Sequence, residues 1–166
     1  MLAGGCFWCL QADLDALEGV VATTVGYEGG DAPNPTYELV SSGVSGYVEA
    51  VEVLFDPEKI SYRELLEAYW RMIDPTRGDG QFCDTGSQYR PVIFYFSEEQ
   101  RASAEASRCE LAREVSPIQA AILPGKTFYP AEEFHQKYYL KNPLRYKFYR
   151  RNCGRDRRLF EIWKSN

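Results

Sequence analysis

The amino-acid sequence predicts an α+β fold, a two-layer sandwich in which helices cover one face of a mixed or antiparallel sheet. The expected elements follow the order β-α-β-β-α-β-α, so two strands succeed each other with no helix between them. A doubly wound parallel sheet would instead require strands and helices to alternate strictly. The length of 166 residues, 45% of them hydrophobic, suits one domain over residues 1–166 with a core of its own.

The first half of the chain supplies one helix and two long strands. After a short first strand, Phe7–Leu17 is expected to be helical, because Gly19 is a typical residue just past a helix end. Val20–Tyr27 is rich in Val and Thr, which predicts a strand. Glu28–Pro35 is dense in Gly, Pro, Asp and Asn, which predicts a loop, and Tyr47–Phe55 is the next expected strand.

The clearest helix signal follows. Ser61 and Glu64 form a capping box, apolar residues recur after them at helical spacing, and the Asp-Pro pair at 74–75 ends the helix. Arg77–Ser87 is rich in turn residues and is a predicted loop. Pro91–Phe96 is a predicted strand.

A second capping box, made by Ser97 and Gln100, opens a helix that we expect to reach about Val115. Beyond it we expect a strand and two helices, over Ile118–Leu123, Ala131–Lys141 and Asp156–Lys164. Together these elements suggest a ferredoxin-like β-α-β-β-α-β core, followed by a long and irregular C-terminal tail.

Charge is distributed unevenly along the chain. The net charge is −5, whereas Leu144–Asn166 contains eight Lys or Arg and two acidic residues. Such a tail is compatible with nucleic-acid binding, but a nucleic-acid-binding domain is usually basic overall. We therefore expect the tail to lie over the acidic body of the same chain, with no nucleic-acid partner. No apolar run reaches the roughly 18–20 residues of a membrane span. The N-terminus lacks the pattern of a secretory signal, so we expect no membrane contact and a cytoplasmic location.

The sequence contains five cysteines, at Cys6, Cys9, Cys83, Cys109 and Cys153. Without an export signal they are expected to be thiols in a reducing compartment rather than a disulfide framework. No metal is expected, because a zinc site would need a second ligand pair with the right spacing. Cys109 falls on an apolar helix face and is expected in the core, and the single histidine, His135, is expected to be structural.

The stretch 4–9, with the sequence G-G-C-F-W-C, is the strongest pointer to chemistry. Two glycines allow a tight turn into a helix, which places Cys6 at the helix N-terminus, where free N–H groups and the helix dipole favour a thiolate. Phe7 and Trp8 add apolar surface beside the sulfur, which suits a substrate with a small apolar group near its reacting atom. On spacing alone, Cys6 could equally be a small buried residue, or Cys6 and Cys9 a redox pair.

Several motifs, in order and at matching spacing, make the chain resemble one family. They are G-C-F-W-C at 5–9, V-G-Y-E-G-G at 25–30, N-P-T-Y at 34–37, S-G-V-S-G-Y-V-E-A-V at 42–51, D-T-G-S-Q-Y-R at 84–90, F-Y-P-A-E-E-F-H-Q at 128–136 and K-N-P-L-R-Y-K-F-Y-R at 141–150. On these motifs the sequence resembles the peptide methionine sulfoxide reductase A family over nearly its whole length.

The resemblance implies an enzyme that reduces methionine-S-sulfoxide, free or in proteins, and so repairs proteins after oxidative damage. It implies that Cys6 is the nucleophile, which becomes a sulfenic acid and then part of an intramolecular disulfide, and that Glu49 protonates the sulfoxide oxygen. The implied substrate-binding residues are Phe7 and Trp8 for the methyl group, Tyr37 and Tyr89 for the oxygen, and Asp84, which orders the site. The implied enzyme is a monomer without a bound cofactor, reduced by thioredoxin or another dithiol.

The strand that contains Glu49 does not by itself identify the acid. Each of its two faces holds three apolar residues and one glutamate, Glu49 on one face and Glu52 on the other. The resemblance selects Glu49. A general acid must carry its proton before the reaction, so we expect burial to raise the pKa of this carboxyl.

The sequence does not decide which thiol resolves the sulfenic acid. Cys9 lies one helical turn from Cys6 and is the first candidate. Cys153 is the second, because the family often keeps a resolving cysteine in the C-terminal tail. The remaining alternatives are Cys83, which stands before Asp84 where the family frequently has asparagine or alanine, or no resolving cysteine at all. Cys9 and Cys153 could also act in series.

Two other functions compete with the one that the resemblance implies. One is a general thiol oxidoreductase that exchanges disulfides through Cys6 and Cys9. The other is a binding module without enzymatic activity that uses the basic tail on nucleic acid.

Overall fold

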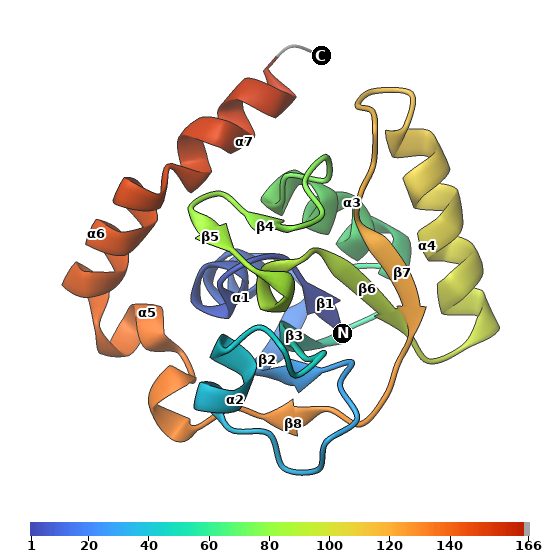
Figure 1. The fold of residues 1–166 in the computed structure, drawn as a ribbon. Coiled ribbons are helices and arrows are strands. Elements are labelled where there is room, and N and C mark those ends of the chain that lie inside the picture. The colour runs from blue at the N-terminus through green and yellow to red at the C-terminus, as the bar shows by residue number, and fades with distance from the viewer. Residues whose placement is uncertain (165–166) are drawn as a thin grey trace.

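A six-stranded sheet lies at the centre of the computed structural model, which describes residues 1–164 (Figure 1). The strands lie in the order β7-β6-β1-β3-β2-β8; β6 and β7 run parallel, and the other neighbouring pairs run antiparallel. They span Leu2–Ala3 (β1), Val20–Glu28 (β2), Val48–Phe55 (β3), Val92–Tyr95 (β6), Ala121–Pro124 (β7) and Tyr129–Pro130 (β8). The predicted α+β class with a mixed sheet is confirmed.

Helices and one small hairpin surround this sheet. The α-helices span Phe7–Asp15 (α1), Tyr37–Ser41 (α2), Tyr62–Met72 (α3), Glu98–Leu111 (α4), Tyr138–Lys141 (α5), Pro143–Cys153 (α6) and Arg155–Trp163 (α7). Single 3₁₀ turns lie at Ser87–Tyr89 (η1) and Glu133–His135 (η2), and a hairpin pairs Gly80–Gln81 (β4) with Asp84–Thr85 (β5). The capping box at the start of α3 forms as predicted, with the Ser61 and Glu64 side chains each accepting from the other's backbone N–H.

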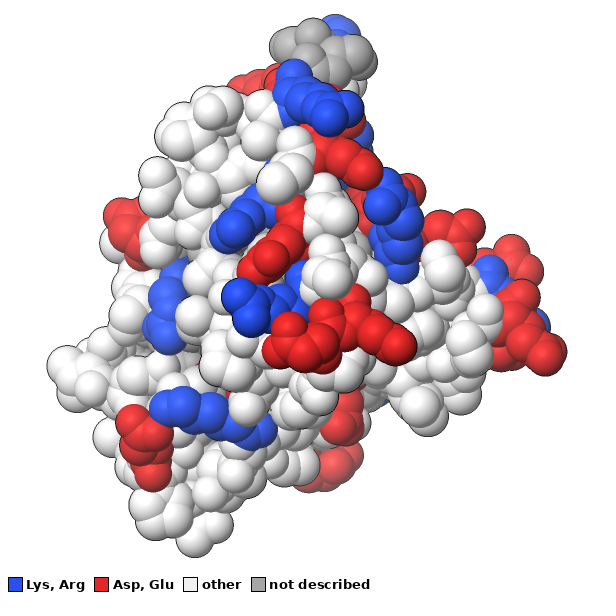
Figure 2. Space-filling model, turned by 90° about the vertical axis from the view of Figure 1, so that its right-hand side faces the viewer, with Lys and Arg blue, Asp and Glu red and all other residues white. Residues whose placement is uncertain are grey.

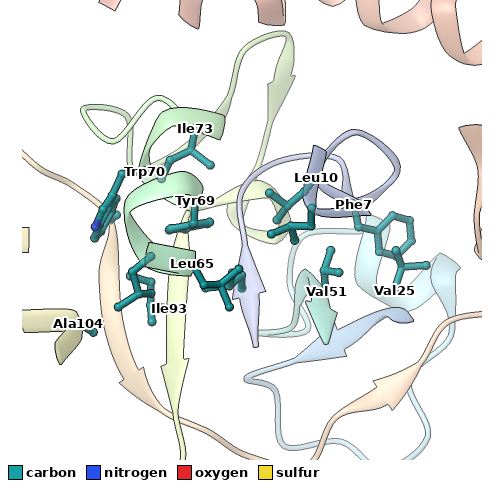
Figure 3. Close-up of a cluster of buried hydrophobic side chains, with 14 of the residues drawn as sticks. Phe7, Leu10, Val25, Val51, Leu65, Tyr69, Trp70, Ile73, Ile93 and Ala104 are labelled. Atoms are coloured by element: carbon teal, nitrogen blue, oxygen red, sulfur yellow. The ribbon is translucent and has the colours of Figure 1, made fainter. Parts of the chain in front are cut away.

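The main hydrophobic cluster lies where α1, α3 and α4 cover the sheet (Figure 3). Its side chains include Phe7 and Leu10 of α1, Leu65 and Tyr69 of α3, Ala104 of α4, and Val25, Val51 and Ile93 of the strands. A smaller cluster contains the intervening strand residues Ala3, Val48, Ala50, Val92 and Phe94. Successive strand residues point to opposite faces, so the three helices share one face of the sheet.

The predicted helix over Ala131–Lys141 is wrong in its first part. The chain there forms η2 and then the short helix α5, because Lys137 adopts a left-handed conformation with φ of 51°. The Gln136 side chain also hydrogen-bonds the backbone N–H and C=O of Val25, which holds this segment against β2. Long-range contacts of this kind are invisible to a helix-periodicity argument.

The expectation of an irregular C-terminal tail is also wrong. Helices α6 and α7 follow each other along the side of the molecule opposite α4 (Figure 1). Pro143 at the first turn of α6 and Gly154, with φ of 71°, at its end are typical helix start and stop residues. The sequence therefore carried the signals for α6.

The basic C-terminal segment lies against acidic side chains of the body, as predicted. Arg150 Nη1 is 2.7 Å from an Asp13 oxygen, and Arg158 Nε is 2.7 Å from an Asp74 oxygen. On the face that carries α4 and β7, side chains of both signs are interspersed (Figure 2). Within residues 1–164, no helix combines the length and apolar character that a bilayer crossing requires.

Arg155 anchors this segment, and its loss is expected to destabilise the fold. The side chain is 1% exposed, and its guanidinium donates to the backbone carbonyls of Met72, at 2.6 Å, and Gly4, at 3.4 Å. Arg155→Met leaves both buried carbonyls without this donor, so the free energy of unfolding should fall by about 2–3 kcal/mol. Urea unfolding measures the change. Arg151→Met, an exposed site on α6, is the control, expected within about 0.5 kcal/mol of wild type; equal losses in the two variants would contradict the anchoring role.

Candidate active site

The loop before α1 is shaped by two glycines. Gly5 has φ of 81°, in the left-handed region, and a Cβ on Gly4 would come within 2.4 Å of the Ile73 side chain. This turn connects β1 to α1 and leaves Cys6 at the position just before the first helical residue, Phe7. The cysteine therefore lies at the N-terminus of α1, as predicted.

A cavity of about 100 Å³ opens at this point. It is lined by Cys6, Phe7 and Trp8 at the start of α1, Tyr37 of α2, Glu49 of β3, Asp84 of β5, Tyr89 of η1 and Tyr149 of α6. All of these except Tyr149 are site residues predicted from the sequence; Tyr149 lies in the motif at 141–150, but nothing local distinguished it from other tyrosines. A wider groove, of about 470 Å³ between α3 and α4, contains none of the predicted site residues.

The structure distinguishes the two glutamates of β3. Glu49 is 3% exposed and lines the cavity, whereas Glu52 is exposed. The backbone N–H of Phe7 donates to Glu49 Oε2 at 2.9 Å, so this carboxyl group lies at the N-terminus of α1 beside Cys6. Burial raises the pKa of Glu49 to about 8. The carboxyl group therefore carries a proton at neutral pH.

The structure does not favour the thiolate that was expected at Cys6. The side chain is 7% exposed, and burial raises the pKa of its thiol well above the usual value. The helix N-terminus contributes only about 0.3–2 kcal/mol, whereas full burial shifts a pKa by as much as about 3–5 units. The first N–H groups also serve carboxyls, Phe7 donating to Glu49 and Cys6 to Asp84.

Cys9 lies behind Cys6 and away from the cavity. It is 2% exposed and shares a hydrogen bond with the Cys6 thiol. As the acceptor of this bond, Cys9 has a lowered pKa, and the charges of Arg155 and Arg150 lower it further. Of the two thiols, Cys9 therefore ionises more readily.

Trp8 is held firmly in the cavity wall. Its indole N–H donates to His135 Nδ1 at 3.0 Å, and its ring stacks on Tyr138 at 3.8 Å between centroids. His135 is 1% exposed, and burial lowers its pKa, so it is neutral with its proton on the other nitrogen. This arrangement agrees with the structural role expected for His135.

The polar side of the cavity consists of phenols and one more carboxyl group. Burial raises the pKa values of Tyr37 and Tyr89, so both phenols remain protonated and can donate hydrogen bonds. Tyr149 donates to Asp84 Oδ2 at 2.5 Å. The cavity thus combines a thiol, a neutral carboxylic acid and phenolic donors with an aromatic wall.

Comparison with known proteins identifies the family. The family model of peptide methionine sulfoxide reductase matches residues 1–166. The chain belongs to the peptide methionine sulfoxide reductase family. It is 49% identical over 166 residues to peptide methionine sulfoxide reductase MsrA of Halalkalibacterium halodurans, covering 98% of this chain and 94% of that protein. It is 48% identical over 165 residues to MsrA 2 of Caulobacter vibrioides, covering 98% and 84%.

Solved structures agree with this assignment to the MsrA enzymes. The reductase matches the reduced form of Mxr1 from Saccharomyces cerevisiae with a TM-score of 0.81 and 34% identity, over 86% of this chain and 83% of that one. The chain is therefore a peptide methionine sulfoxide reductase, and methionine sulfoxide is the substrate that its family implies.

Two expectations for the cysteines of the reductase are wrong: that all five are thiols, and that Cys109 lies in the core. Cys83, in the turn of the β4–β5 hairpin, and Cys153, at the end of α6, form a disulfide, so these two are not thiols. Cys109 is free but exposed, because α4 buries Ala104, Ser107 and Leu111 instead. Cys109 follows Ser107 by two residues, about 200° around the helix, which turns it to solvent.

One group of potential metal ligands occurs among residues 1–164 of the reductase. It contains Cys83, Asp84 and Cys153, whose ligand atoms lie within 4.8 Å of one another. The two sulfurs are bonded to each other, so neither is available as a thiolate ligand in this state.

Proposed function

We propose that residues 1–166 form one catalytic domain, a two-layer sandwich on a ferredoxin-like β-α-β-β-α-β core, that reduces methionine-S-sulfoxide through a sulfenic acid on Cys6. The observation that carries the proposal is that Cys6 and the protonated Glu49 line the same cavity of about 100 Å³. A sulfoxide is a poor electrophile, so a positioned acid beside the nucleophile is the arrangement that its reduction needs.

The walls of the cavity suit the two small groups on the substrate sulfur. Phe7 and Trp8 form the apolar side, against which the methyl group packs. Glu49, Tyr37 and Tyr89 supply protons or hydrogen bonds to the oxygen, and Asp84 with its partner Tyr149 orders that side. Fixing oxygen, methyl and the attacking sulfur at three places in a chiral pocket selects one epimer, which we propose to be the S form.

The first step transfers oxygen from the substrate to Cys6. Cys6 Sγ attacks the sulfoxide sulfur while Glu49 protonates the oxygen, and the thiol proton of Cys6 replaces the proton that Glu49 gives up. The attack forms a transient bond between the two sulfurs. The hydroxyl group then moves from the substrate sulfur to Cys6 Sγ as this sulfur–sulfur bond breaks, which leaves methionine, reduced by two electrons. Cys6 becomes a sulfenic acid, oxidised by two electrons.

The sulfenic acid then condenses with a second thiol of the chain. Cys9 is the proposed partner, because its sulfur shares a hydrogen bond with Cys6 and its pKa is lowered. Condensation forms a Cys6–Cys9 disulfide and releases water. Cys153 stays the alternative partner.

A dithiol of the thioredoxin type is the proposed external reductant. In this proposal the enzyme works as a cytoplasmic monomer, without a bound cofactor, and repairs oxidised proteins.

Single-turnover release of methionine tests the proposal. The fully reduced enzyme, without external reductant, is mixed with one equivalent of the separated S or R epimer. We expect about one equivalent of methionine from the S epimer and none from the R epimer, since the thiols of Cys6 and Cys9 hold the two electrons that one turnover requires. Release from the R epimer would overturn the epimer assignment. Reduction of insulin disulfides without sulfoxide reduction would favour the general thiol oxidoreductase instead.

A further inference from the structure

The Cys83–Cys153 disulfide lies next to the catalytic cavity, although neither cysteine lines it. Cys153 Sγ is 4.0 Å from Asp84 Oδ2, and Asp84 lines the cavity and accepts the backbone N–H of Cys6. The disulfide closes a loop across 70 residues, from the β4–β5 turn to the end of α6. The Asp84 carboxyl group therefore lies between the nucleophile and this second pair of sulfurs.

The two pairs of cysteines differ in their exposure to solvent. Cys6 is 7% exposed and Cys9 is 2% exposed, whereas Cys83 is exposed and Cys153 half-buried. A groove of about 400 Å³, lined in part by Phe82, Cys153 and Gly154, opens beside the second pair. Thiol–disulfide exchange requires the attacking thiolate to reach a sulfur directly. A folded dithiol protein can therefore approach Cys83–Cys153, but not a disulfide between Cys6 and Cys9.

We infer that Cys83 is a redox residue of this reductase, and that Cys83 and Cys153 form the exit disulfide, which carries the oxidising equivalents from the cavity to the external reductant. This inference rests on the proposed function of Cys6. It adds to that proposal a relay thiol in the β4–β5 turn, outside both the cysteine motif at 5–9 and the C-terminal tail.

The relay balances in atoms and electrons. The Cys153 thiolate attacks Cys6 Sγ in the Cys6–Cys9 disulfide, so a Cys6–Cys153 bond forms and Cys9 leaves as a thiolate. Cys83 then attacks Cys153 Sγ, which forms Cys83–Cys153 and releases Cys6. The two protons that Cys153 and Cys83 lose end on Cys9 and Cys6, and two electrons move from the outer pair to the inner pair.

The charges around Cys9 favour transfer of the disulfide from the Cys6–Cys9 pair to the Cys83–Cys153 pair. Arg150 and Arg155 stabilise the Cys9 thiolate, and a thiol of low pKa leaves faster in thiol–disulfide exchange. Both arginines belong to the segment that carries Cys153, on α6 and α7. After the exchange, the free thiols are Cys6, Cys9 and Cys109, which is the distribution in the structure.

Locating the disulfide after one turnover tests the relay. The reduced enzyme is oxidised with one equivalent of the S-sulfoxide, its free thiols are alkylated, and the peptides are identified by mass spectrometry. We expect one equivalent of methionine, alkylated Cys6, Cys9 and Cys109, and a Cys83–Cys153 cross-link. One equivalent of methionine with a persistent Cys6–Cys9 cross-link, and with Cys83 and Cys153 alkylated, would overturn the relay alone. Absence of methionine would instead overturn the proposed function.

Cys83→Ser provides the second test. It should leave single-turnover methionine release unchanged, which also shows that the variant is folded. The oxidised variant should hold its disulfide on Cys6, and turnover with a thioredoxin-type protein dithiol should fall roughly tenfold or more, because the protein reductant no longer meets an exposed disulfide. Cys109→Ser, at an exposed free cysteine, is the matched control and should turn over normally. Wild-type turnover of Cys83→Ser with the protein reductant would overturn the inference.

Discussion

Cys6→Ser is expected to lower methionine release by about 10³-fold or more in both single and multiple turnover. Sulfur accepts the sulfoxide oxygen as a sulfenic acid, and a serine hydroxyl has no corresponding oxidation step. The other groups of the cavity, including the neutral Glu49, remain in place in this variant. The loss should therefore reflect the chemistry of one atom rather than the binding of the substrate.

The measurement is methionine released per enzyme with the S epimer. Cys109→Ser is the matched control, since it removes an exposed free thiol far from any proposed role. Thermal unfolding of both variants confirms that they fold. Methionine release by Cys6→Ser at the wild-type level would exclude Cys6 as the nucleophile.

Glu49→Gln is expected to slow the single-turnover step by about 10²- to 10⁴-fold, the usual contribution of a general acid. The amide oxygen of glutamine can still accept the hydrogen bond from the Phe7 N–H, so the local structure should persist while the acidic proton is lost. Glu52→Gln, on the same strand but exposed, is the control and should react at the wild-type rate. The opposite order of the two variants would reassign the acid.

The difference in rate between the wild type and Glu49→Gln should become smaller as the pH rises. Burial raises the pKa of Glu49 to about 8, so its proton-donating form is complete below that pH and is lost as the pH rises through it. We therefore expect the ratio of the wild-type rate to the Glu49→Gln rate to be constant at pH 6–7 and to fall above about pH 8. Ionisation of Cys6 affects both rates, so its effect largely cancels in the ratio. A ratio that rises with pH would contradict a protonated Glu49.

The site was predicted mainly through motifs rather than through local physics. Cys6, Phe7 and Trp8 are contiguous, and glycines before them indicate a tight turn. Tyr37 and Asp84 come from separate segments, and no periodicity connects them with the cysteine; only the resemblance did so. The sequence did not indicate a site role for Tyr149, because an aromatic residue in a basic segment is usually a packing residue.

Strand alternation alone does not distinguish Glu49 from Glu52 as the acid. It divides β3 into two faces of equal composition, with Glu49 on one and Glu52 on the other. The choice between the faces depends on what packs over each of them. The Phe7 N–H, 42 residues away in sequence, donates to Glu49, whereas Glu52 remains exposed.

The sequence by itself determined the features that neighbouring residues control. These include the capped start of α3, the glycine turn that leads into α1, and the position of Cys6 at the end of that turn. Capping and turn formation depend on groups a few residues apart, so their signals are local.

Only the tertiary structure decided the properties that depend on burial and on distant contacts. It placed Glu49 rather than Glu52 in the cavity, kept Cys6 as a thiol, and joined Cys83 to Cys153 across 70 residues. Desolvation depends on everything that surrounds a group, and a disulfide requires two distant segments to meet within a few ångströms. Neither condition can be evaluated until the chain has folded.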